Sequence, residues 1–570
     1  MTSLPEHSTR MGSKCIIPLT GRPPESRPTN TYIQHIWFWI YLRIFISIGK
    51  GDTMSSFVVA CLGAIAGTYM FSWALLYFTQ DAKEPRAIAN TIPFITPILG
   101  MAAKKANFYR MMRDKYDLPL YTLRMPGSRI YVINSTSLIP VVQRQFRTLA
   151  FTALESNLIR DLMGVSKSTH DIMSRNLVRD EGYLMVFPKY IHSAVSAGPG
   201  LDSMNRRSVE ILAESLDKLT EKGSMINKMF EWTRHELLMA TTEAVYGPKN
   251  PYRDPAMEEA WYKFESGIMM FVLKLWPQVF AKESFKARKY MGKIWERYFE
   301  SGAHKEASEL IQCRFKINED FQIPLKETAK IEVGGSFAIL SNTLPATFWM
   351  IYHIFSDPVV LEDIRAELFK HVKEVDEICT IDLADVKGSC PILLSTFKEM
   401  LRYNAIGVSA RIAIEDHMLD NKYLIKKGST VMIPSKVQHT IPSIWGETVN
   451  EFHHKRFIRQ PGIKAHNPIS FRGFGGGTTL CPGRHFASTE VLMFSALMAL
   501  RFDIRPVGGK WLRPTTEKSP LVAAIPVPDW DIDVEICPRD KKKWNVSFSG
   551  YGKDMEISVE DIGGTKAGVH

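Results

Sequence analysis

The sequence predicts a mainly α-helical domain with small β-sheets, preceded by one transmembrane helix. Three observations support this fold class. Apolar residues recur with helical spacing through most of the stretch from Leu138 to Phe355. Short alternating runs, typical of strands, occur near residues 121–133 and 409–434. Residues 57–78 carry no charge and, as a helix rising about 1.5 Å per residue, would span about 33 Å, which is enough to cross a bilayer.

Composition narrows the class of protein. The chain has 570 residues, a formal net charge of +11 and seven cysteines. No linker stands between about Pro93 and Pro538, so we expect one large domain. The sequence shows no zinc-finger, RNA-binding or helix-turn-helix signature, which argues against nucleic acid; the positive charge suits an anionic membrane surface or an acidic protein partner. Sparse cysteines in odd number indicate a reducing compartment rather than a disulfide framework.

The expected domain order begins with a polar, basic extension over residues 1–56, which contains a candidate second membrane segment at 33–49. Residues 57–78 form a membrane anchor rather than a removed signal, because a large domain follows and no small-residue cleavage site is present. The rest of the chain is expected to comprise a proline-containing linker (79–98), the folded domain (99–540) and a loose C-terminal tail (541–570).

Between residues 138 and 372, the apolar periodicity predicts seven helices. They are expected near 138–150, 201–221, 224–246, 257–275, 283–304, 325–355 and 359–372. A hairpin is predicted from Tyr121–Arg124 and Ile130–Ile133, and a further strand at Thr430–Ile433 after a turn at Lys427–Gly428.

A glycine-rich loop from Phe474 to Arg484 delivers one cysteine, Cys481, to the start of an amphipathic helix. Pro482 suits the first helical position, so Cys481 is expected at the cap, where free N–H groups favour a thiolate. No other Cys or His lies at zinc-ligand spacing, which argues against a zinc site. The alternative without a function is a buried cysteine in a turn. A single thiolate on such a loop is a good axial ligand for haem iron.

The pattern Phe474, Gly477, Cys481 and Gly483 resembles the haem-binding signature of the cytochrome P450 family, Phe-x-x-Gly-x-x-x-Cys-x-Gly. The resemblance covers roughly residues 90–540. It implies the helix-rich P450 fold and haem b held by the Cys481 thiolate, with Phe474, Gly477 and Gly483 shaping the binding loop.

Two further segments extend the resemblance. Glu399 and Arg402 stand at i and i+3 of an expected helix, and Arg456 follows about fifty residues later. The family buries a Glu-Arg-Arg network from these segments beneath the haem, whereas an isolated pair of this spacing is usually solvated. The family's usual proline two residues before the second arginine is replaced by His454.

The resemblance also implies partners for the haem propionates. Arg411 matches a family strand position that contacts a propionate. The family often has a basic residue two before the cysteine, but this chain has Thr479, so another donor is expected. Arg206 or Arg207 is the candidate, with Arg207 preferred; an ordinary surface arginine is the alternative for each.

The helix expected at 325–355 departs from the common acid–threonine pair that relays protons to dioxygen in the family. Ser341 and Asn342 stand in its place, followed by Thr343, and these three are the candidate catalytic residues. The run Asn342 to Trp349 resembles the steroid 7α-hydroxylase and prostacyclin synthase branch. Pro345 lacks an N–H, so the helix should kink near Ser341, and the Asn342 amide could orient water or a peroxide oxygen. A plain proline kink is the alternative.

The resemblance implies a monooxygenase that inserts one oxygen atom from O2 into an apolar small molecule, by hydroxylation or epoxidation. Electrons would come from NADPH-cytochrome P450 reductase, because the chain has no flavin or nicotinamide motif; Arg472 and Arg484 are expected to face this acidic partner. The stretch Leu521–Pro526 resembles the family's last substrate-contact turn. Two rivals remain at this point: a haem-thiolate isomerase or dehydratase acting on a peroxide without O2 or reductase, and a non-catalytic haem-binding sensor.

The likeness is closest to fungal microsomal members, many of which tailor terpenoids, steroids, polyketides or alkaloids. It implies an endoplasmic reticulum membrane location, single-pass, with the catalytic domain facing the cytosol. The sequons at Asn134 and Asn545 would then stay unmodified.

Overall fold

The computed structural model describes residues 53–88, 91–459 and 466–549, together with Met555, Ile557 and Asp561. The chain divides into two compact units, Met1–Ala74 and Leu75–His570. The predicted extension up to residue 52, including the candidate membrane segment at 33–49, lies outside the described residues.

The first described element is helix α2 (Thr53–Thr79). Its stretch Val58–Thr79 is long and apolar enough to cross a membrane, and Leu76 is its one buried residue. Apolar side chains such as Ile65 and Phe71 are exposed. A helix that is apolar and almost entirely unburied suits a lipid environment, which agrees with the predicted position of the anchor.

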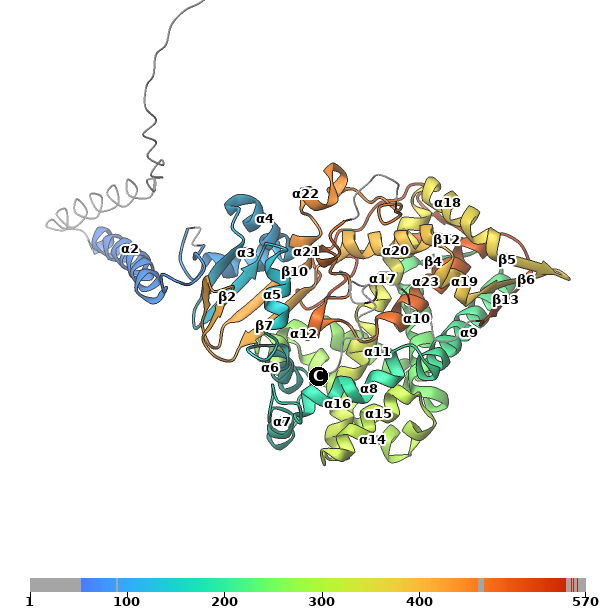
Figure 1. The fold of residues 1–570 in the computed structure, drawn as a ribbon, viewed down its shortest axis with the longest axis horizontal. Coiled ribbons are helices and arrows are strands. Elements are labelled where there is room, and N and C mark those ends of the chain that lie inside the picture. The colour runs from blue at the N-terminus through green and yellow to red at the C-terminus, as the bar shows by residue number, and fades with distance from the viewer. Residues whose placement is uncertain are drawn as a thin grey trace, which may run out of the picture. The chain divides into compact units, whose positions relative to one another are not determined.

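Helices dominate the second unit (Figure 1). In chain order they are α3 (Thr96–Lys104), α4 (Ala106–Tyr116), α5 (Leu138–Arg144), α6 (Phe151–Leu158), α7 (Lys167–Met173), α8 (Tyr183–Val195), α9 (Pro199–Lys222), α10 (Met229–Tyr246), α11 (Pro255–Ser266), α12 (Ile268–Val272), α13 (Pro277–Phe280), α14 (Lys282–Glu300), α15 (Glu309–Asp320), α16 (Leu325–Leu340), α17 (Thr343–Phe355), α18 (Pro358–Leu368), α19 (Leu383–Gly388), α20 (Pro391–Asn404), α21 (Ser435–Gln438), α22 (Pro442–Trp445) and α23 (Arg484–Arg501).

Four small sheets accompany the helices, as expected for this fold class. Their strands are β1 (Leu120–Met125), β2 (Ser128–Ile133), β3 (Leu149–Ala150), β4 (Met225–Lys228), β5 (Val372–Val375), β6 (Ile378–Asp382), β7 (Val408–Ala413), β8 (His417–Leu419), β9 (Tyr423–Ile425), β10 (Thr430–Pro434), β11 (Phe502–Pro506), β12 (Asp533–Pro538) and β13 (Lys543–Ser547). The largest sheet has the order β1-β2-β10-β7-β3 and lies at one end of the unit, away from α9 and α18 (Figure 1). The predicted hairpin β1–β2 is antiparallel and pairs Leu123 with Ile130.

Helices α17 and α23 form the centre of the main core. Every residue of α17 is buried, and so is every residue of α23 after Arg484 except Ala487. Both helices are largely apolar on all sides, as expected for helices that other elements surround. Together they place the cysteine loop, which precedes α23, against the rigid interior of the unit.

Several predicted helices differ from the observed ones for local reasons. The helix expected at 224–246 begins with β4 instead, because Met225–Lys228 pairs with β12. The helix expected at 257–275 breaks at Gly267, where a Cβ would lie 2.5 Å from the Ser284 side chain of α14. The helix expected at 138–150 ends at Arg144, and Leu149–Ala150 joins the large sheet as β3.

The predicted linker and tail are both more tightly bound than expected. In the linker, the buried Glu84 carboxylate accepts a hydrogen bond from the Tyr131 hydroxyl (2.7 Å) and lies 3.4 Å from Arg129 Nε. The tail is not loose over Lys543–Ser547, because β13 pairs in parallel with β6. Backbone pairing of this kind is invisible in the composition of a polar segment.

Candidate functional site

The cysteine loop is closed by its own backbone. The Cys481 N–H donates to the Phe474 carbonyl at 2.9 Å. Gly475 and Gly477 have φ values of +82° and +57°, which disfavour any side chain, and a Cβ on Gly475 would lie 2.4 Å from the Thr479 carbonyl oxygen. Gly483 has φ −83° and meets no atom within 4 Å of where a Cβ would stand, so packing within the described chain does not demand glycine there.

The helix after the loop begins at Arg484, two residues later than Pro482 suggested, and Gly483 takes the cap position. Burial raises the pKa of the Cys481 thiol and outweighs the Gly483 N–H and the Arg484 charge, both of which lower it. The expected preference for a thiolate is therefore not supplied by the helix start alone. A bound metal ion would deprotonate the thiol.

Two guanidinium groups are buried beside this loop. Arg411, on β7, is 0% exposed, and Arg472 is 4% exposed. Within the described residues, Arg411 Nε and Nη1 have no hydrogen-bond partner, while Nη2 donates to Thr479 Oγ1 at 3.4 Å. Burial, and secondly the charge of Arg472, lower the pKa of Arg411 to about 10. Two neighbouring buried cations, of which Arg411 has donors without a partner in the described residues, form a strong site for an anion.

The expectation that Arg207 supplies the second cation is not supported by its position. Arg207 is exposed on α9 and pairs with Glu210 Oε2 at 3.4 Å, and the Arg206 guanidinium stacks over the Phe548 ring. The second buried cation beside the loop is Arg472. The sequence had suggested that Arg472 faces an acidic partner, which its burial contradicts. The sequence feature that could have indicated this burial is the place of Arg472 two residues before Phe474, just ahead of the loop.

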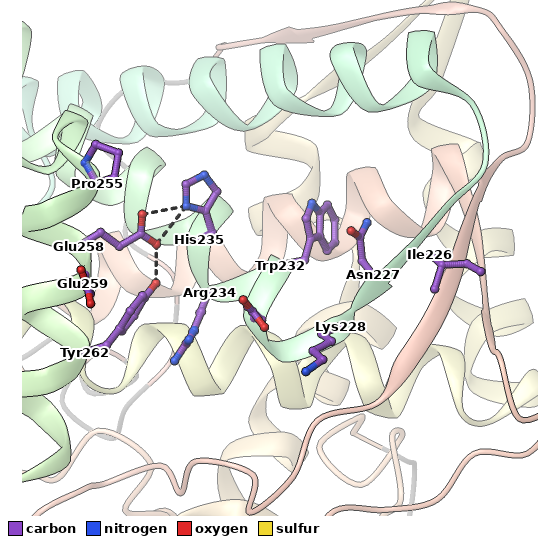
Figure 2. Close-up of a pocket in the computed structure, with 11 residues that line it drawn as sticks. Ile226, Asn227, Lys228, Trp232, Arg234, His235, Pro255, Glu258, Glu259 and Tyr262 are labelled. Carbon is purple, nitrogen blue, oxygen red and sulfur yellow. Dashed lines mark hydrogen bonds and ion pairs between the residues drawn. The ribbon is translucent and has the colours of Figure 1, made fainter.

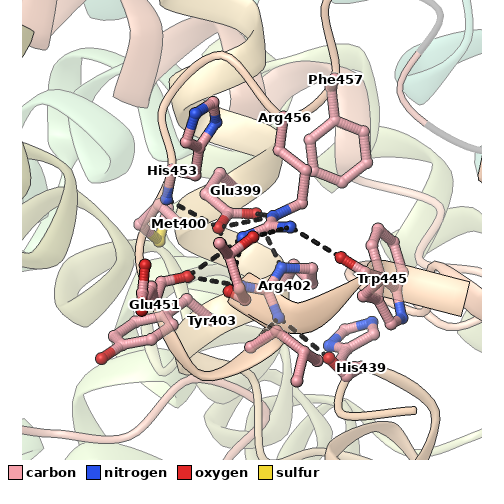
Figure 3. A network of polar contacts seen from close by, with 12 residues as sticks. Glu399, Met400, Arg402, Tyr403, His439, Trp445, Glu451, His453, Arg456 and Phe457 are labelled. Carbon is pink, nitrogen blue, oxygen red and sulfur yellow. Dashed lines mark hydrogen bonds and ion pairs between the residues drawn. The ribbon is translucent and has the colours of Figure 1, made fainter. Parts of the chain in front are cut away.

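The predicted Glu399–Arg402–Arg456 contact is present and buried (Figure 3). Arg402 Nε and Nη2 donate to the two carboxylate oxygens of Glu399 at 2.7 and 2.8 Å, and Arg456 Nε donates to the same oxygens at 3.0 and 3.1 Å. The remaining nitrogens donate to backbone carbonyls, including those of His439 and Trp445. Every buried charge in this network therefore has a partner, as a stable buried ion cluster requires.

His454, which replaces the family's proline, makes its own contact. Its Nε2 lies 2.7 Å from Asp363 Oδ2 on α18. The segment that carries Arg456 is thus held at a second point, so the departure from the family pattern leaves the network intact.

The long helix breaks where Pro345 predicted. Helix α16 ends at Leu340, α17 starts at Thr343, and Asn342 between them has φ −110° and ψ −30°. Ser341 and Thr343 are both buried. Without an N–H on Pro345 the Ser341 carbonyl has no helical partner four residues on, which explains the break.

The Asn342 side chain is engaged in a way the sequence did not predict. Its Oδ1 accepts hydrogen bonds from the Ala524 and Ile525 N–H groups at 2.9 and 3.2 Å. Its Nδ2 donates to Ser341 Oγ at 3.3 Å. The amide oxygen that was expected to orient water or a peroxide oxygen therefore holds the stretch Leu521–Pro526 instead.

That stretch, called here the substrate turn (Leu521–Pro526), is tied down at two further points. Trp349 Nε1 donates to the Pro526 carbonyl at 2.7 Å. The Ile406 and Gly407 N–H groups donate to the Ala524 carbonyl at 2.8 and 3.2 Å. The turn is thus fixed between the helix break and the segment before β7, the strand of Arg411.

A separate surface groove of about 570 Å³ lies between β4, the start of α10 and α11 (Figure 2). In this groove, the Glu258 carboxylate accepts a hydrogen bond from the Tyr262 hydroxyl at 2.7 Å and lies 3.0 Å from His235 Nδ1. The contact with this carboxylate raises the pKa of His235. Among the described residues that line the groove, none belongs to the cysteine loop or the helix break. Because the groove is separate from both features, it is not the candidate site.

Comparison with known proteins agrees with this geometry. The sequence profile of the cytochrome P450 family matches residues 88–529. Cytochrome P450 monooxygenase nodJ from Hypoxylon pulicicidum is 34% identical over 488 residues, which cover 82% of this chain and 93% of that protein. A cytochrome P450 monooxygenase from Gibberella zeae is 27% identical over 460 residues, 79% of this chain and 86% of that protein.

A more distant relative, the cholesterol 7-alpha-monooxygenase of Cricetulus griseus, is 28% identical over 247 residues, 40% of this chain and 49% of that protein. It bears out the predicted likeness to the steroid 7α-hydroxylase branch. Members of the matched family carry haem-thiolate iron, act on small molecules and generally use a redox partner. The profile spans most of the chain and the nodJ likeness spans nearly all of the relative, so this chain belongs to the cytochrome P450 family and is a P450 monooxygenase.

Proposed function

We propose that Cys481 is the axial thiolate ligand of a b-type haem, and that this haem lies against the glycine-rich loop. The observation that carries the proposal is the pairing of a single loop cysteine with two buried guanidinium groups, Arg411 and Arg472. A haem presents one metal ion for the thiolate and two carboxylates for the cations, which matches this donor set.

The surrounding residues fit the same group. The Arg411 donors that lack a partner in the described chain would bind a propionate. Gly477 and Gly483 would let a flat macrocycle approach the backbone, which explains glycine at position 483, where protein packing does not require it. Bound haem-thiolate iron supplies the activation of dioxygen.

On the substrate side, the chain's own residues would bind and orient the substrate. Ser341 is the candidate for moving a proton, because its buried hydroxyl stands at the helix break. Asn342 acts as a positioning residue, since its Oδ1 holds the substrate turn. Val522, whose side chain is half-buried within that turn, would contact an apolar substrate and help to exclude water.

Electrons would come from NADPH-cytochrome P450 reductase. The α2 helix would anchor the enzyme in a membrane as a single pass, which its length and exposed apolar surface support. The membrane would be that of the endoplasmic reticulum, with the second unit in the cytosol, as the likeness to microsomal members implies. The substrate would be an apolar terpenoid, steroid, polyketide or alkaloid, hydroxylated or epoxidised in a fungal tailoring step. The two fungal relatives are cytochrome P450 monooxygenases, which supports an oxygenation reaction.

The ligand assignment is tested with Cys481→Ala. We expect loss of the red-shifted Soret band of the reduced, carbon monoxide-bound protein, because only a thiolate ligand produces that shift. Cys390→Ala, which removes another buried cysteine, is the matched control and should keep the band. An unchanged band in the Cys481 variant would refute the assignment.

The reaction is tested by adding reductase, NADPH and extracts of the producing strain. We expect consumption of both NADPH and O2, together with a product that gains one oxygen atom. Turnover of a hydroperoxide with neither NADPH nor O2 would instead establish rearrangement of a peroxide and contradict the proposed reaction.

A further inference from the structure

The C-terminal segment reaches back to the start of α23. Asp561 Oδ1 accepts from Arg484 Nη2 at 2.6 Å and from Arg484 Nε at 3.1 Å. Asp561 Oδ2 accepts from the Ile557 N–H at 3.2 Å, and the Met555 and Ile557 side chains are buried in the main core. The carboxylate is therefore held by its own segment as well as by Arg484.

The Arg484 guanidinium contacts both Asp561 and the backbone carbonyl of Cys481. Arg484 Nη1 points to the Cys481 carbonyl at 3.4 Å, while its other nitrogens hold Asp561. The Asp561 side chain is 6% exposed and that of Arg484 is 18% exposed, so solvent screens the pair only weakly. Among the described residues, Asp561 is the one carboxylate that forms an ion pair with Arg484.

Two consequences follow from charge and geometry. The bidentate pair fixes the Arg484 side chain, and with it the first turn of α23 that follows the cysteine. The negative charge of Asp561 also offsets the positive charge of Arg484 close to Cys481. A charge held at this depth acts on the cysteine loop more strongly than a surface charge would.

We propose that Asp561 is a positioning residue of the cysteine loop, which acts through Arg484 to hold the loop and to set the charge beside the sulfur. The proposal rests on the proposed role of Cys481 as the haem ligand. It assigns a function to a C-terminal segment that lies beyond the part matched by the family profile, which ends at residue 529.

The chain offers a matched control at the other end of the same helix. Arg501 closes α23 and donates to Asp217 Oδ1 at 2.6 Å. The two arginines are 17 residues apart, which corresponds to about 25 Å along a helix. Asp217, on α9, pairs with the far end of α23, so Asp217→Asn removes a carboxylate partner from an arginine of the same helix, but far from the cysteine.

The experiment uses the full-length holoenzyme and two measurements that do not depend on turnover. The first is the midpoint reduction potential of the haem iron. The second is the rate at which the red-shifted Soret band of the reduced, carbon monoxide-bound protein is lost on mild warming. We expect Asp561→Asn to raise the potential, because a nearby negative charge favours the ferric state, and to speed the loss of the band several-fold.

Further variants separate positioning from simple stability. Asp561→Glu should restore the potential at least in part. Arg484→Gln should lower the potential, and the double variant Arg484→Gln/Asp561→Asn should return it toward the wild-type value, because the two charges cancel. A role in stability alone would not produce opposite shifts. If Asp561→Asn fails to fold, the Glu and Arg484 variants still decide the matter.

Equal potentials and equal rates of band loss in Asp561→Asn and Asp217→Asn would overturn the proposal. A wild-type protein without the red-shifted band would overturn the ligand assignment as well. The two failures are thus distinguishable, since the first leaves the wild-type spectrum normal.

Discussion

Arg411 shows how a single side chain reveals a binding requirement. A fully buried guanidinium with two nitrogens that lack partners in the described chain is costly, because burial of an unpaired donor typically costs about 1–3 kcal/mol. Proteins rarely keep such a group unless a ligand completes it. The positive charge of the neighbouring Arg472 repels that of Arg411. An anion between the two guanidinium groups would offset this repulsion and pair the open donors of Arg411.

Replacing Arg411 tests this interpretation. Arg411→Ala should weaken haem binding about 10- to 100-fold, since a hydrogen bond to a charged group contributes about 1.5–3 kcal/mol. The measurement is the haem-to-protein ratio after purification and the rate of haem transfer to an acceptor protein. Arg207→Ala removes an exposed arginine that pairs with Glu210 and serves as the control. Equal haem retention in both variants would contradict the assignment.

Glu490, in α23, is a buried acid without a cation. Its Oε1 accepts from Ser208 Oγ at 2.6 Å and from Thr241 Oγ1 at 2.8 Å, and burial raises its pKa to about 8. Below pH 4.5 both the folded and the unfolded chain keep the proton. Between pH 4.5 and 8 only the folded state keeps it, so rising pH favours unfolding across that window.

Glu490→Gln removes this titration while keeping an oxygen for both hydroxyl groups. The variant should match the wild type in stability near pH 4.5 and exceed it increasingly up to pH 8, by about 1.4 kcal/mol for each pH unit. Melting temperatures measured at several pH values check this. Glu231→Gln, an exposed position in α10, should follow the wild type. Parallel profiles for Glu490→Gln and the wild type would show that Glu490 is ionised when folded.

At the scale of elements, the break between α16 and α17 organises the substrate side. Pro345 interrupts the helix, and the free Asn342 side chain then binds the substrate turn, which lies about 180 residues later in the chain. Trp349, one turn further along α17 than Pro345, fixes the end of the same turn at Pro526. One helix thus sets both the break and the position of a distant loop.

The role of Asn342 can be separated into its oxygen and its nitrogen. Asn342→Asp keeps the acceptor for the Ala524 and Ile525 N–H groups, whereas Asn342→Ala removes it. We expect hydrogen exchange at these two amides to accelerate about 5- to 30-fold in the Ala variant, which corresponds to a loss of about 1–2 kcal/mol, and to stay near wild type in the Asp variant. Unchanged protection in Asn342→Ala would show that the turn is held without this side chain.

These elements also show what the sequence could predict. The i, i+3 spacing of Glu399 and Arg402 predicted their contact, because such residues share a helix face. The missing N–H of Pro345 predicted the break in the long helix. The contact of Arg456 with Glu399, 57 residues away, was predicted only through the family resemblance. Other contacts across long separations were not predictable, since neither periodicity nor local propensity encodes them. Asn342 with Ala524 and Arg484 with Asp561 are of this kind, and so is the burial of Arg472.

At the scale of the whole molecule, the junction that follows the apolar helix is held by side-chain contacts within the second unit. Thr79, the last residue of α2, accepts a hydrogen bond from Arg124 Nη1 on β1 at 3.2 Å. Glu84 is buried against Tyr131 and Arg129 on β2. The chain therefore becomes part of the sheet immediately after α2 ends, which fixes where a functional truncation can begin.

Two truncations test this junction. Removing residues 1–78 deletes the apolar helix but keeps Thr79 and Glu84, so we expect at least partial release from membranes with the red-shifted Soret band intact. Removing residues 1–90 also deletes Glu84, which takes away the acceptor of the Tyr131 hydroxyl and the ion-pair partner of Arg129. This loss should cost about 1–3 kcal/mol and lower the melting temperature by a few degrees. Membrane sedimentation and thermal unfolding measure the two effects. Complete retention of the shorter deletion in the membrane fraction would mean that a surface of the catalytic domain, rather than α2, binds the membrane.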